Sequence, residues 1–311
     1  MRMVLMLLAA LAFTAPARAQ DRIVTEADGS RTLVTEVWVP AAPDAVWRAV
    51  SSAEGWKSWA VLHAWQDGNL VETSYNPQAK QGDPANIQQR FTVLIPGTLL
   101  SFQTVRTPPG FPHSAAYRGV TSAFEVLPEG TGTRVRLTGS NYPAGAAGTE
   151  LLGFFEKGNR VSLDRLAARF GLAPLDFLTG HCWRGTLPTG DINTHCFDRM
   201  DGKIRDRHDV IRAGKKVYGG ETLYTWDGEA RTIAFTYTGL GGTGGKGKAR
   251  ADGEDIDFGS TDYASGSGTI TVATRWVRIA PNVYEARDSS AKAQFNHNIK
   301  YTRLETGYTV Q

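Results

Sequence analysis

One long helical pattern divides this chain of 311 residues into two parts of different character. Apolar side chains recur at helical spacing from Thr149 to Phe170, the longest run of this kind in the sequence. Gly171 and Pro174 end the pattern, because glycine terminates helices readily and proline cannot continue them. Strands and short helices precede this point, and almost no helical pattern follows it. We therefore expect two units that are joined by a short junction and pack against each other.

The first unit, residues 31–172, has the element order of an α+β fold. Alternating side chains predict a strand at 33–39, and Pro43 suits the first turn of a short helix that precedes a second one at 54–60. Further strands are expected at 86–95, 99–105, 119–127 and 133–140, followed by the long helix at 149–170. A curved sheet wrapped on a long helix leaves a cleft between them, and such clefts hold apolar ligands.

Three segments of this unit carry a family resemblance. They are TEVWVPAAPDAVWRAVSSAEGWKSWA, RFTVLIPGTLLSFQTV and LLGFFEKGNRVSLDRLAARF. Residues 31–172 resemble the SRPBCC (START-like) superfamily, in the branch related to the activator of Hsp90 ATPase. The resemblance implies a helix-grip fold and a ligand cleft. The members of the superfamily include lipid carriers, cyclases and chaperone cofactors, so the resemblance specifies a fold more than a reaction.

The second unit, residues 175–311, has the pattern of an all-β fold. Turn signals separate strands expected at 181–187, 191–198, 203–212, 216–226, 231–238, 246–258, 269–279, 282–288 and 294–304. The opening FLTGHCWRG is similar to the start of the calycin barrels (lipocalins, fatty-acid-binding proteins and nitrobindins), although two residues, not one, separate Gly180 from Trp183. The expected fold is an α+β helix-grip unit followed by an antiparallel, calycin-like β-barrel.

The amino terminus has the pattern of a signal peptide. Arg2 supplies a positive charge, residues 3–13 are apolar, and Ala17-Arg18-Ala19 is a cleavage signal before Gln20. The apolar run is too short to span a bilayer, which takes about 20 residues, and no later stretch is apolar enough. Removing residues 1–19 brings the balance of 34 basic and 31 acidic side chains close to neutral, which excludes the footprint of a nucleic-acid binder. We expect a periplasmic or secreted protein with no integral membrane segment. The sequence does not define its oligomeric state.

The two cysteines admit three interpretations. In a hairpin centred on Thr189, Cys182 faces Cys196 and Trp183 faces His195. Opposed strand residues lie within reach of a disulfide, and an oxidising compartment permits one. A zinc site with His181 and His195 is disfavoured, because alternation places the histidines on the opposite face from the cysteines. Two buried free thiols remain the third interpretation.

The sequence contains no catalytic motif with the required spacing and context. The glycine tract 239–249 approaches a phosphate loop, but Ala249 replaces the magnesium-binding hydroxyl and a strand pattern, not a helix, follows, so a hairpin loop is expected. His208, between two aspartates, and His297 are acid–base candidates, whereas His63 and His113 have no assignable role. A basic cluster interrupted by aspartates is expected to be a solvated strand face: Lys203, Arg205, Arg207, Arg212, Lys215 and Lys216.

A ligand site in the barrel is predicted from aromatic and polar side chains that share strand faces. An apolar lining with a few polar groups is typical of ligand pockets, although a solid core has the same composition. The predicted lining is Trp183, His195, Tyr224, Trp226, Trp276 and His297. No metal or cofactor is expected. The alternative is haem, because nitrobindin-like barrels bind it through a histidine near the carboxyl end, and His297 is the position that could correspond.

Three functional hypotheses follow. The chain is best interpreted as an exported, non-enzymatic protein that binds a small apolar ligand in the helix-grip cleft, the barrel or both. The first alternative is an enzyme that uses one of these cavities, either a cyclase-like first unit or a haem-bearing barrel. The second alternative is a module that serves a protein partner.

Overall fold

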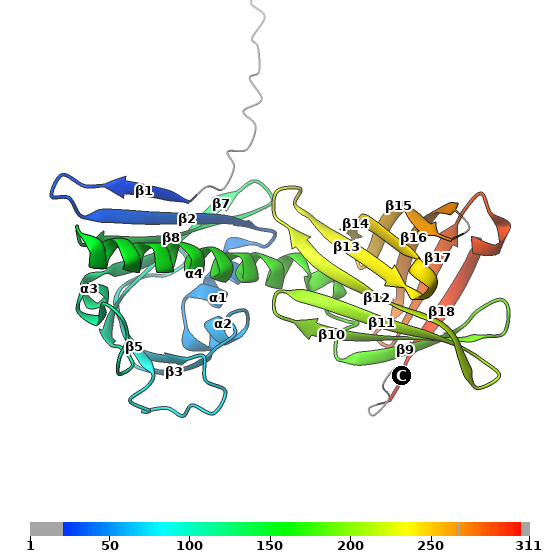
Figure 1. Ribbon diagram of the computed structural model, residues 1–311, viewed down its shortest axis with the longest axis horizontal. Helices are drawn as coiled ribbons and strands as arrows, with labels where there is room; N and C mark the ends of the chain where they lie inside the picture. The colour runs from blue at the N-terminus through cyan, green and yellow to red at the C-terminus, as the bar shows by residue number, and fades with distance from the viewer. Residues whose placement is uncertain (1–20, 267, 306–311) are drawn as a thin grey trace, which may run out of the picture.

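The protein is seen here in a computed structural model, which describes residues 21–266 and 268–305. It contains two antiparallel sheets. A helix-grip unit is followed by a closed ten-stranded barrel (Figure 1), which confirms the expected fold class. The predicted signal peptide and its cleavage site lie outside the described residues. Within the described part of the chain, no helix has the length and apolar character that crossing a membrane requires.

The helix-grip unit wraps an eight-stranded sheet, in the order β1-β2-β8-β7-β6-β5-β4-β3, around a long helix. Its elements are β1 (Arg22–Thr25), β2 (Arg31–Val39), α1 (Pro43–Val50), α2 (Ala53–Lys57), β3 (His63–Asp67), β4 (Leu70–Ser74), β5 (Ile87–Ile95), β6 (Leu99–Arg106), α3 (Ser114–Gly119), β7 (Thr121–Glu129), β8 (Gly132–Tyr142) and α4 (Ala146–Gly171). Pro43 occupies the first turn of α1, and the Ser52 hydroxyl accepts a hydrogen bond from the Gly55 amide at the start of α2.

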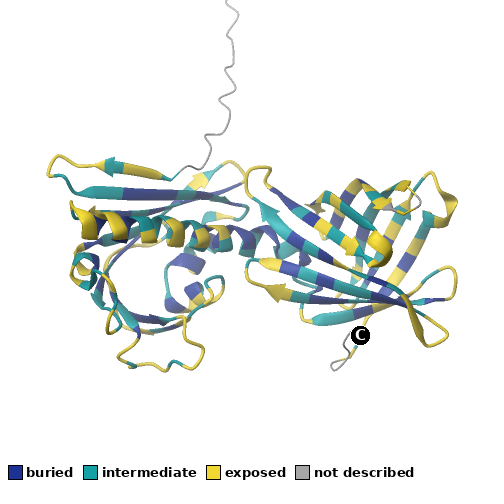
Figure 2. Ribbon diagram, in the orientation of Figure 1, coloured by how far each residue is buried: buried dark blue, intermediate teal, exposed yellow. Residues whose placement is uncertain are grey.

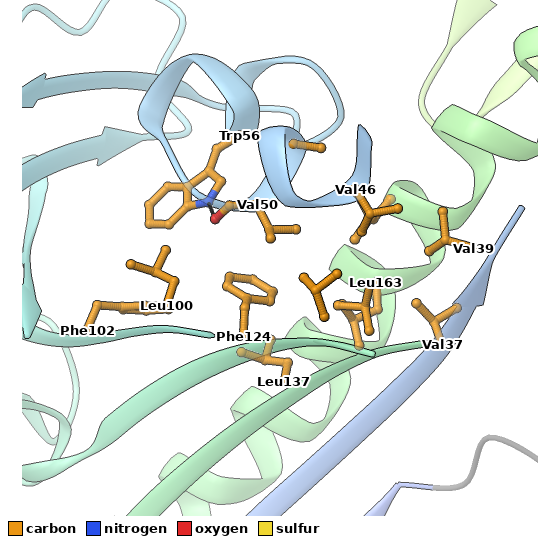
Figure 3. Packing of buried hydrophobic residues seen from close by; sticks show 14 of the residues in the cluster. Val37, Val39, Val46, Val50, Trp56, Leu100, Phe102, Phe124, Leu137 and Leu163 are labelled. Carbon is orange, nitrogen blue, oxygen red and sulfur yellow. Dashed lines mark hydrogen bonds between the residues drawn. The ribbon is translucent and has the colours of Figure 1, made fainter. Parts of the chain in front are cut away.

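The core of this unit lies between the sheet, helices α1 and α2, and one face of α4 (Figure 3). Leu163 and Leu166 of α4 are fully buried against Val37 and Val39 of β2. The Trp56 indole donates a hydrogen bond of 2.7 Å to the Val50 carbonyl, so α2 is tied to the end of α1. The helical spacing seen in the sequence therefore buries α4 against the sheet along one side only.

The barrel is a meander in which consecutive strands from β10 to β18 pair, and its last strand, β18, pairs with its first, β9. Its elements are η1 (Ala173–Leu175), β9 (His181–Thr186), β10 (Ile192–Met200), β11 (Lys203–Arg212), β12 (Lys215–Asp227), β13 (Thr232–Gly239), η2 (Leu240–Gly242), β14 (Gly244–Asp252), β15 (Asp255–Ser265), β16 (Gly268–Ala280), β17 (Val283–Ser289), η3 (Ala293–Phe295) and β18 (His297–Arg303). Buried and exposed residues alternate along many of its strands (Figure 2), as expected for a barrel with one face inside.

One predicted strand of the barrel is wrong. The segment 246–258 forms two strands, β14 and β15, because the chain turns at Gly253-Glu254, between Asp252 and its partner Asp255. Gly253 has a φ of +64°, a left-handed conformation that glycine adopts without strain. A glycine at the first position of a two-residue loop is a hairpin signal.

The two cysteines form the disulfide Cys182–Cys196. It joins β9 to β10, and the Leu187 amide donates a hydrogen bond of 2.9 Å to the Asp191 carbonyl at the turn between them. No cluster of three or more possible metal ligands occurs among the described residues. The disulfide interpretation of the sequence is therefore the one that the structure contains.

The two units pack against each other where helix α4 ends. Trp226 of β12 contacts the cores of both units, and its ring stacks on Trp38 of β2 with centroids 6.4 Å apart. The Arg231 guanidinium lies 4.1 Å from the Trp38 ring and pairs with Glu129 at 2.9 Å. The boundary between units 31–172 and 175–311 stays a prediction, because the end of α4 contributes to the barrel core.

Removing both cysteines should destabilise the barrel. The C182A/C196A variant is expected to lose about 3 kcal/mol of unfolding free energy in urea, because the disulfide closes a loop across a sequence separation of 14. A reductant should lower the stability of the wild-type protein toward that of the variant and leave the variant unchanged. Equal stabilities of the oxidised wild-type protein and the variant would contradict this expectation.

A side chain at position 171 should disrupt the junction. A Cβ atom on Gly171 would lie 2.2 Å from the Trp226 ring, so G171A is expected to cost about 1–3 kcal/mol in a thermal or urea melt. The control is G158A in the same helix, where a Cβ has open space and alanine should be neutral or slightly stabilising. A G171A protein as stable as G158A would show that the junction is not tightly packed.

Candidate functional site

The helix-grip unit contains a cavity of about 440 Å³ between α4, the sheet and the loops after α2 and β6. Its volume lies within the roughly 300–1,000 Å³ of small-molecule sites. The walls are mainly aromatic, and they include Trp56, Trp59, Phe102, Phe124, Tyr142 and Phe155. The predicted cleft is therefore present as a cavity large enough for a small apolar molecule.

Two tryptophans of this cavity are held in place by the backbone of helix α1. The Trp56 indole donates to the Val50 carbonyl at 2.7 Å, and the Trp59 indole donates to the Ala49 carbonyl at 2.8 Å. Each indole thus satisfies its N–H and presents its apolar surface to the cavity. The cavity wall on this side is therefore fixed by the end of α1.

The polar groups in the cavity are hydroxyls and amides. The Tyr117 hydroxyl of α3 hydrogen-bonds with Gln89 and Thr104. Burial raises the pKa of Tyr117, and the same two hydrogen bonds oppose the shift. Among the described residues that line the cavity, none carries a carboxylate, imidazole, thiol, amine or guanidinium. A neutral hydroxyl beside an amide can orient a polar end of a ligand.

The cavity opens where two of its aromatic side chains reach the surface. Tyr75 is 66% exposed and Phe154 of α4 is 61% exposed, although both line the cavity. The Phe154 ring stands edge-on to Phe155, with centroids 5.2 Å apart. Exposed apolar groups at the rim of a hollow are typical of a binding site.

A second hollow, of about 510 Å³, lies beside this mouth and between the two units. It shares the wall residues Trp59 and Tyr75 with the helix-grip cavity. The barrel supplies Asp201, which pairs with Arg165 of α4 through an oxygen–nitrogen distance of 2.6 Å. The mouth of the helix-grip cavity is therefore bordered by the barrel.

The barrel has a separate and more polar cavity of about 220 Å³. Three residues of the predicted lining, His195, Tyr224 and Trp276, lie in its wall. The other titratable groups of that wall are Asp206, His208, Tyr237, Tyr263, Tyr284, Asp288 and Tyr301. Asp206 and His208 could have been found, because Ile204, Asp206, His208 and Val210 alternate along β11 and so share one face.

The structure places the other three predicted lining residues elsewhere. Trp183 is fully buried in the barrel core, where its indole donates to the Leu178 carbonyl at 3.2 Å. Trp226 lies at the junction between the units. His297 lies outside the cavity wall, with Nε2 3.6 Å from Asp288 Oδ2. These three side chains support the barrel but do not line its cavity.

A hydrogen-bond network crosses the barrel wall from β10 to β13. His195 Nδ1 lies 2.8 Å from Asp206 Oδ2, and His195 Nε2 lies 2.8 Å from Asn193 Oδ1. The Asn193 amide nitrogen donates to the Asp209 carbonyl at 3.2 Å, which orients the Asn193 oxygen toward His195. His195 is therefore hydrogen-bonded through both of its ring nitrogens, to Asp206 on one side and to Asn193 on the other.

His208 stacks on its cross-strand neighbour His195, with ring centroids 5.0 Å apart. Its Nε2 lies 3.1 Å from the Tyr237 hydroxyl. Burial, reinforced by the nearby His195, lowers the pKa of His208 from 6.5 to about 4. At neutral pH His208 is thus an uncharged ring that is hydrogen-bonded to the Tyr237 hydroxyl.

The residues of the barrel do not fit haem. His297 does not reach the cavity, and its nearest charged neighbour is the Asp288 carboxylate. The cavity of about 220 Å³ is also smaller than typical cofactor sites, which measure roughly 300–1,000 Å³. The geometry thus gives no support to the haem alternative.

The remaining histidines and the glycine tract have structural positions. His113 pairs with Glu150 at 2.7 Å, and His63 stacks on Trp65. In the glycine tract, residues 244–249 belong to strand β14, and no helix follows. A Cβ on Gly247 would lie 2.5 Å from the Phe235 ring, so the tract makes room for an aromatic wall of the barrel cavity.

The lowered pKa of His208 predicts a pH dependence of stability. In the unfolded chain His208 binds a proton below about pH 6.5. In the folded chain His208 binds this proton only near pH 4. The stability contributed by neutral His208 is therefore complete above pH 6.5 and is lost as pH falls toward 4. Replacing His208 should therefore reduce the loss of unfolding free energy between pH 6.5 and pH 4 by up to about 3 kcal/mol.

This expectation can be tested by urea unfolding of H208Q at pH 7 and pH 4.5. The wild-type protein should lose more stability than H208Q between the two values. H113Q, which replaces a partly exposed histidine, is the control and should follow the wild-type protein. Parallel losses in H208Q and the wild-type protein would contradict the assignment.

Comparison with known proteins concerns mainly the first unit. Residues 30–171 match the family model described as polyketide cyclase / dehydrase and lipid transport. No curated protein matches the chain. The chain is similar to Aha1 from Colwellia psychrerythraea, with 18% identity over 45% of this chain and 95% of that chain and a TM-score of 0.36. It is also similar to CalU16 from Micromonospora echinospora, with 18% identity over 49% of this chain and 85% of that chain and a TM-score of 0.35. Residues 30–171 thus match an SRPBCC-type family model, as the resemblance of residues 31–172 predicts, and a ten-stranded barrel follows them.

Proposed function

We propose that the protein is an exported, non-enzymatic binder of a small apolar ligand, which it holds in the helix-grip cavity. The observation that carries this proposal is the cavity of about 440 Å³ with aromatic walls and a buried Tyr117–Gln89 pair. Apolar walls supply affinity through the burial of ligand surface, and a sparse polar pair orients the ligand. Exposed Tyr75 and Phe154 at the mouth give the ligand an apolar path inward.

The family description supports an apolar ligand without deciding between binding and reaction. It includes lipid transport as well as polyketide cyclisation. Cyclisation of a polyketide requires proton transfers, which positioned acids and bases accelerate. The described cavity wall offers hydroxyls and amides, and burial keeps its Tyr117 protonated. These groups suit retention of a ligand better than proton transfer, and a cyclase-like activity is the alternative outcome.

Two features support export. Residues 1–19 have the pattern of a signal peptide, and the barrel carries a disulfide. Disulfides persist in the periplasm and outside the cell, whereas the cytosol reduces most of them. A ligand carrier in such a compartment would exchange its cargo with its surroundings through the mouth beside Tyr75.

Filling the cavity should abolish ligand binding without harming the fold. Gly158 of α4 lines the cavity, and a Cβ there has open space, so G158F places a ring in the cavity. The neutral fluorescent probe N-phenyl-1-naphthylamine should bind the wild-type protein, and G158F should weaken that binding by about tenfold or more. A tenfold change corresponds to about 1.4 kcal/mol, less than the burial of one large apolar group.

The matched control is G153F, which replaces a glycine of the same helix that also has open space but lies outside the cavity wall. Both variants gain helix propensity, so only the effect on the cavity separates them. Equal probe affinities of G158F and G153F would contradict a site in this cavity. Native mass spectrometry of the purified protein should show a retained apolar compound, and its conversion on incubation would favour the cyclase alternative.

A further inference from the structure

The barrel cavity contains a buried carboxylate oxygen whose hydrogen-bonding capacity is not used by the protein. Asp206 is 1% exposed, and its Oδ2 contacts His195 Nδ1 at 2.8 Å. Within residues 21–266 and 268–305, no group hydrogen-bonds with Asp206 Oδ1, although the side chain lines the cavity. An unpaired buried acceptor destabilises the protein, and more so when it is charged, so a ligand that supplies a donor here recovers that lost free energy.

A second carboxylate faces the same cavity. Asp288 of β17 lines the wall, and its Oδ1 accepts a hydrogen bond of 2.6 Å from Thr274. Its Oδ2 lies 3.6 Å from His297 Nε2, beyond hydrogen-bond distance. Burial raises the pKa of Asp288, whereas His297 and His195 oppose the shift. Two acidic groups thus border one small space, with His195 near both of them.

The rest of the cavity wall is rich in aromatic rings. Tyr224, Phe258, Trp276 and Tyr284 lie close together, and the Phe258 and Trp276 centroids are 4.7 Å apart. The negative faces of aromatic rings attract cations, most strongly where the cation is desolvated. Carboxylates and aromatic rings favour the same kind of ligand, one that combines a positive charge with hydrogen-bond donors.

We propose that the barrel cavity binds a small organic amine in its protonated form, with the ammonium group donating to Asp206 Oδ1. The cavity of about 220 Å³ limits the ligand to about one substituted ring, since an apolar cavity of roughly 150 Å³ holds benzene. This site is separate from the helix-grip cavity, so its occupation does not depend on the apolar ligand proposed above.

The inference is tested first on the wild-type protein, in its mature full-length form, by isothermal titration calorimetry with three probes. Benzylamine carries the cation, benzyl alcohol offers a neutral donor on the same ring, and phenylacetate carries a negative charge. Benzylamine is expected to bind about tenfold or more tightly than benzyl alcohol, because a hydrogen bond between charged groups is the stronger one. Phenylacetate should not bind. Equal affinity for the amine and the alcohol, or no binding of the amine, would overturn the proposal.

The second test is a pair of matched variants on strand β11. D206N removes the charge of the cavity carboxylate and should weaken benzylamine binding by about tenfold or more. D209N changes an equally buried aspartate, 3% exposed, that lies outside the cavity wall and pairs with Lys216. It should bind benzylamine as the wild-type protein does.

A thermal melt shows whether each variant folds. If D206N does not fold, D288N, which changes the cavity carboxylate of strand β17, replaces it, with the same expected loss. An unchanged affinity in the folded cavity variant, or equal losses in the cavity variant and D209N, would overturn the proposal. N-phenyl-1-naphthylamine binding should stay at the wild-type level in all three variants, which distinguishes failure of the amine site from failure of the helix-grip site.

Discussion

Helix α4 packs into both cores of the protein, and the arrangement of the two units depends on it. Leu163 and Leu166 complete the helix-grip core, whereas Ala168, one half-turn later, belongs to the core of the barrel. Trp226 of the barrel contacts both cores at the position where Gly171 leaves no room for a side chain. The junction is therefore a packed continuation of one helix, and unfolding of either unit exposes apolar surface of the other.

This packing gives the helix-grip cavity its border and leaves the barrel cavity apart from it. The mouth of the first cavity lies beside the hollow between the units, where Asp201 of the barrel pairs with Arg165 of α4. The two cavities differ in chemistry. In the first, Tyr117 hydrogen-bonds with Gln89 and with Thr104, whereas the second leaves Asp206 Oδ1 without a hydrogen-bond partner among the described residues. One cavity suits an apolar molecule and the other a molecule with a charged donor.

Much of the fold was predictable because it rests on local patterns. The spacing of Leu163 and Leu166 predicted helix α4, and the cross-strand pairing of Cys182 with Cys196 predicted the disulfide. The segment 246–258 was mispredicted, since two strands joined by a tight turn have the same alternation as one long strand. The barrel lining was predicted from strand faces alone. Trp183 and Trp226 belong to or pack against the barrel core, but neither lines the cavity. The face of a strand does not tell at which height of the barrel a side chain lies, and the side chains near its ends fill it.

The sequence by itself determined an α+β unit, a long helix and an all-β unit, because periodicity, glycine turns and the two cysteines act over a few residues. The tertiary structure alone decided which polar groups meet. His195 and Asp206 lie on neighbouring strands in a register set by the whole barrel, and Asp288 reaches their cavity from another strand, β17. Long-range closure places these groups together, and no pattern within a single strand records the closure of a barrel.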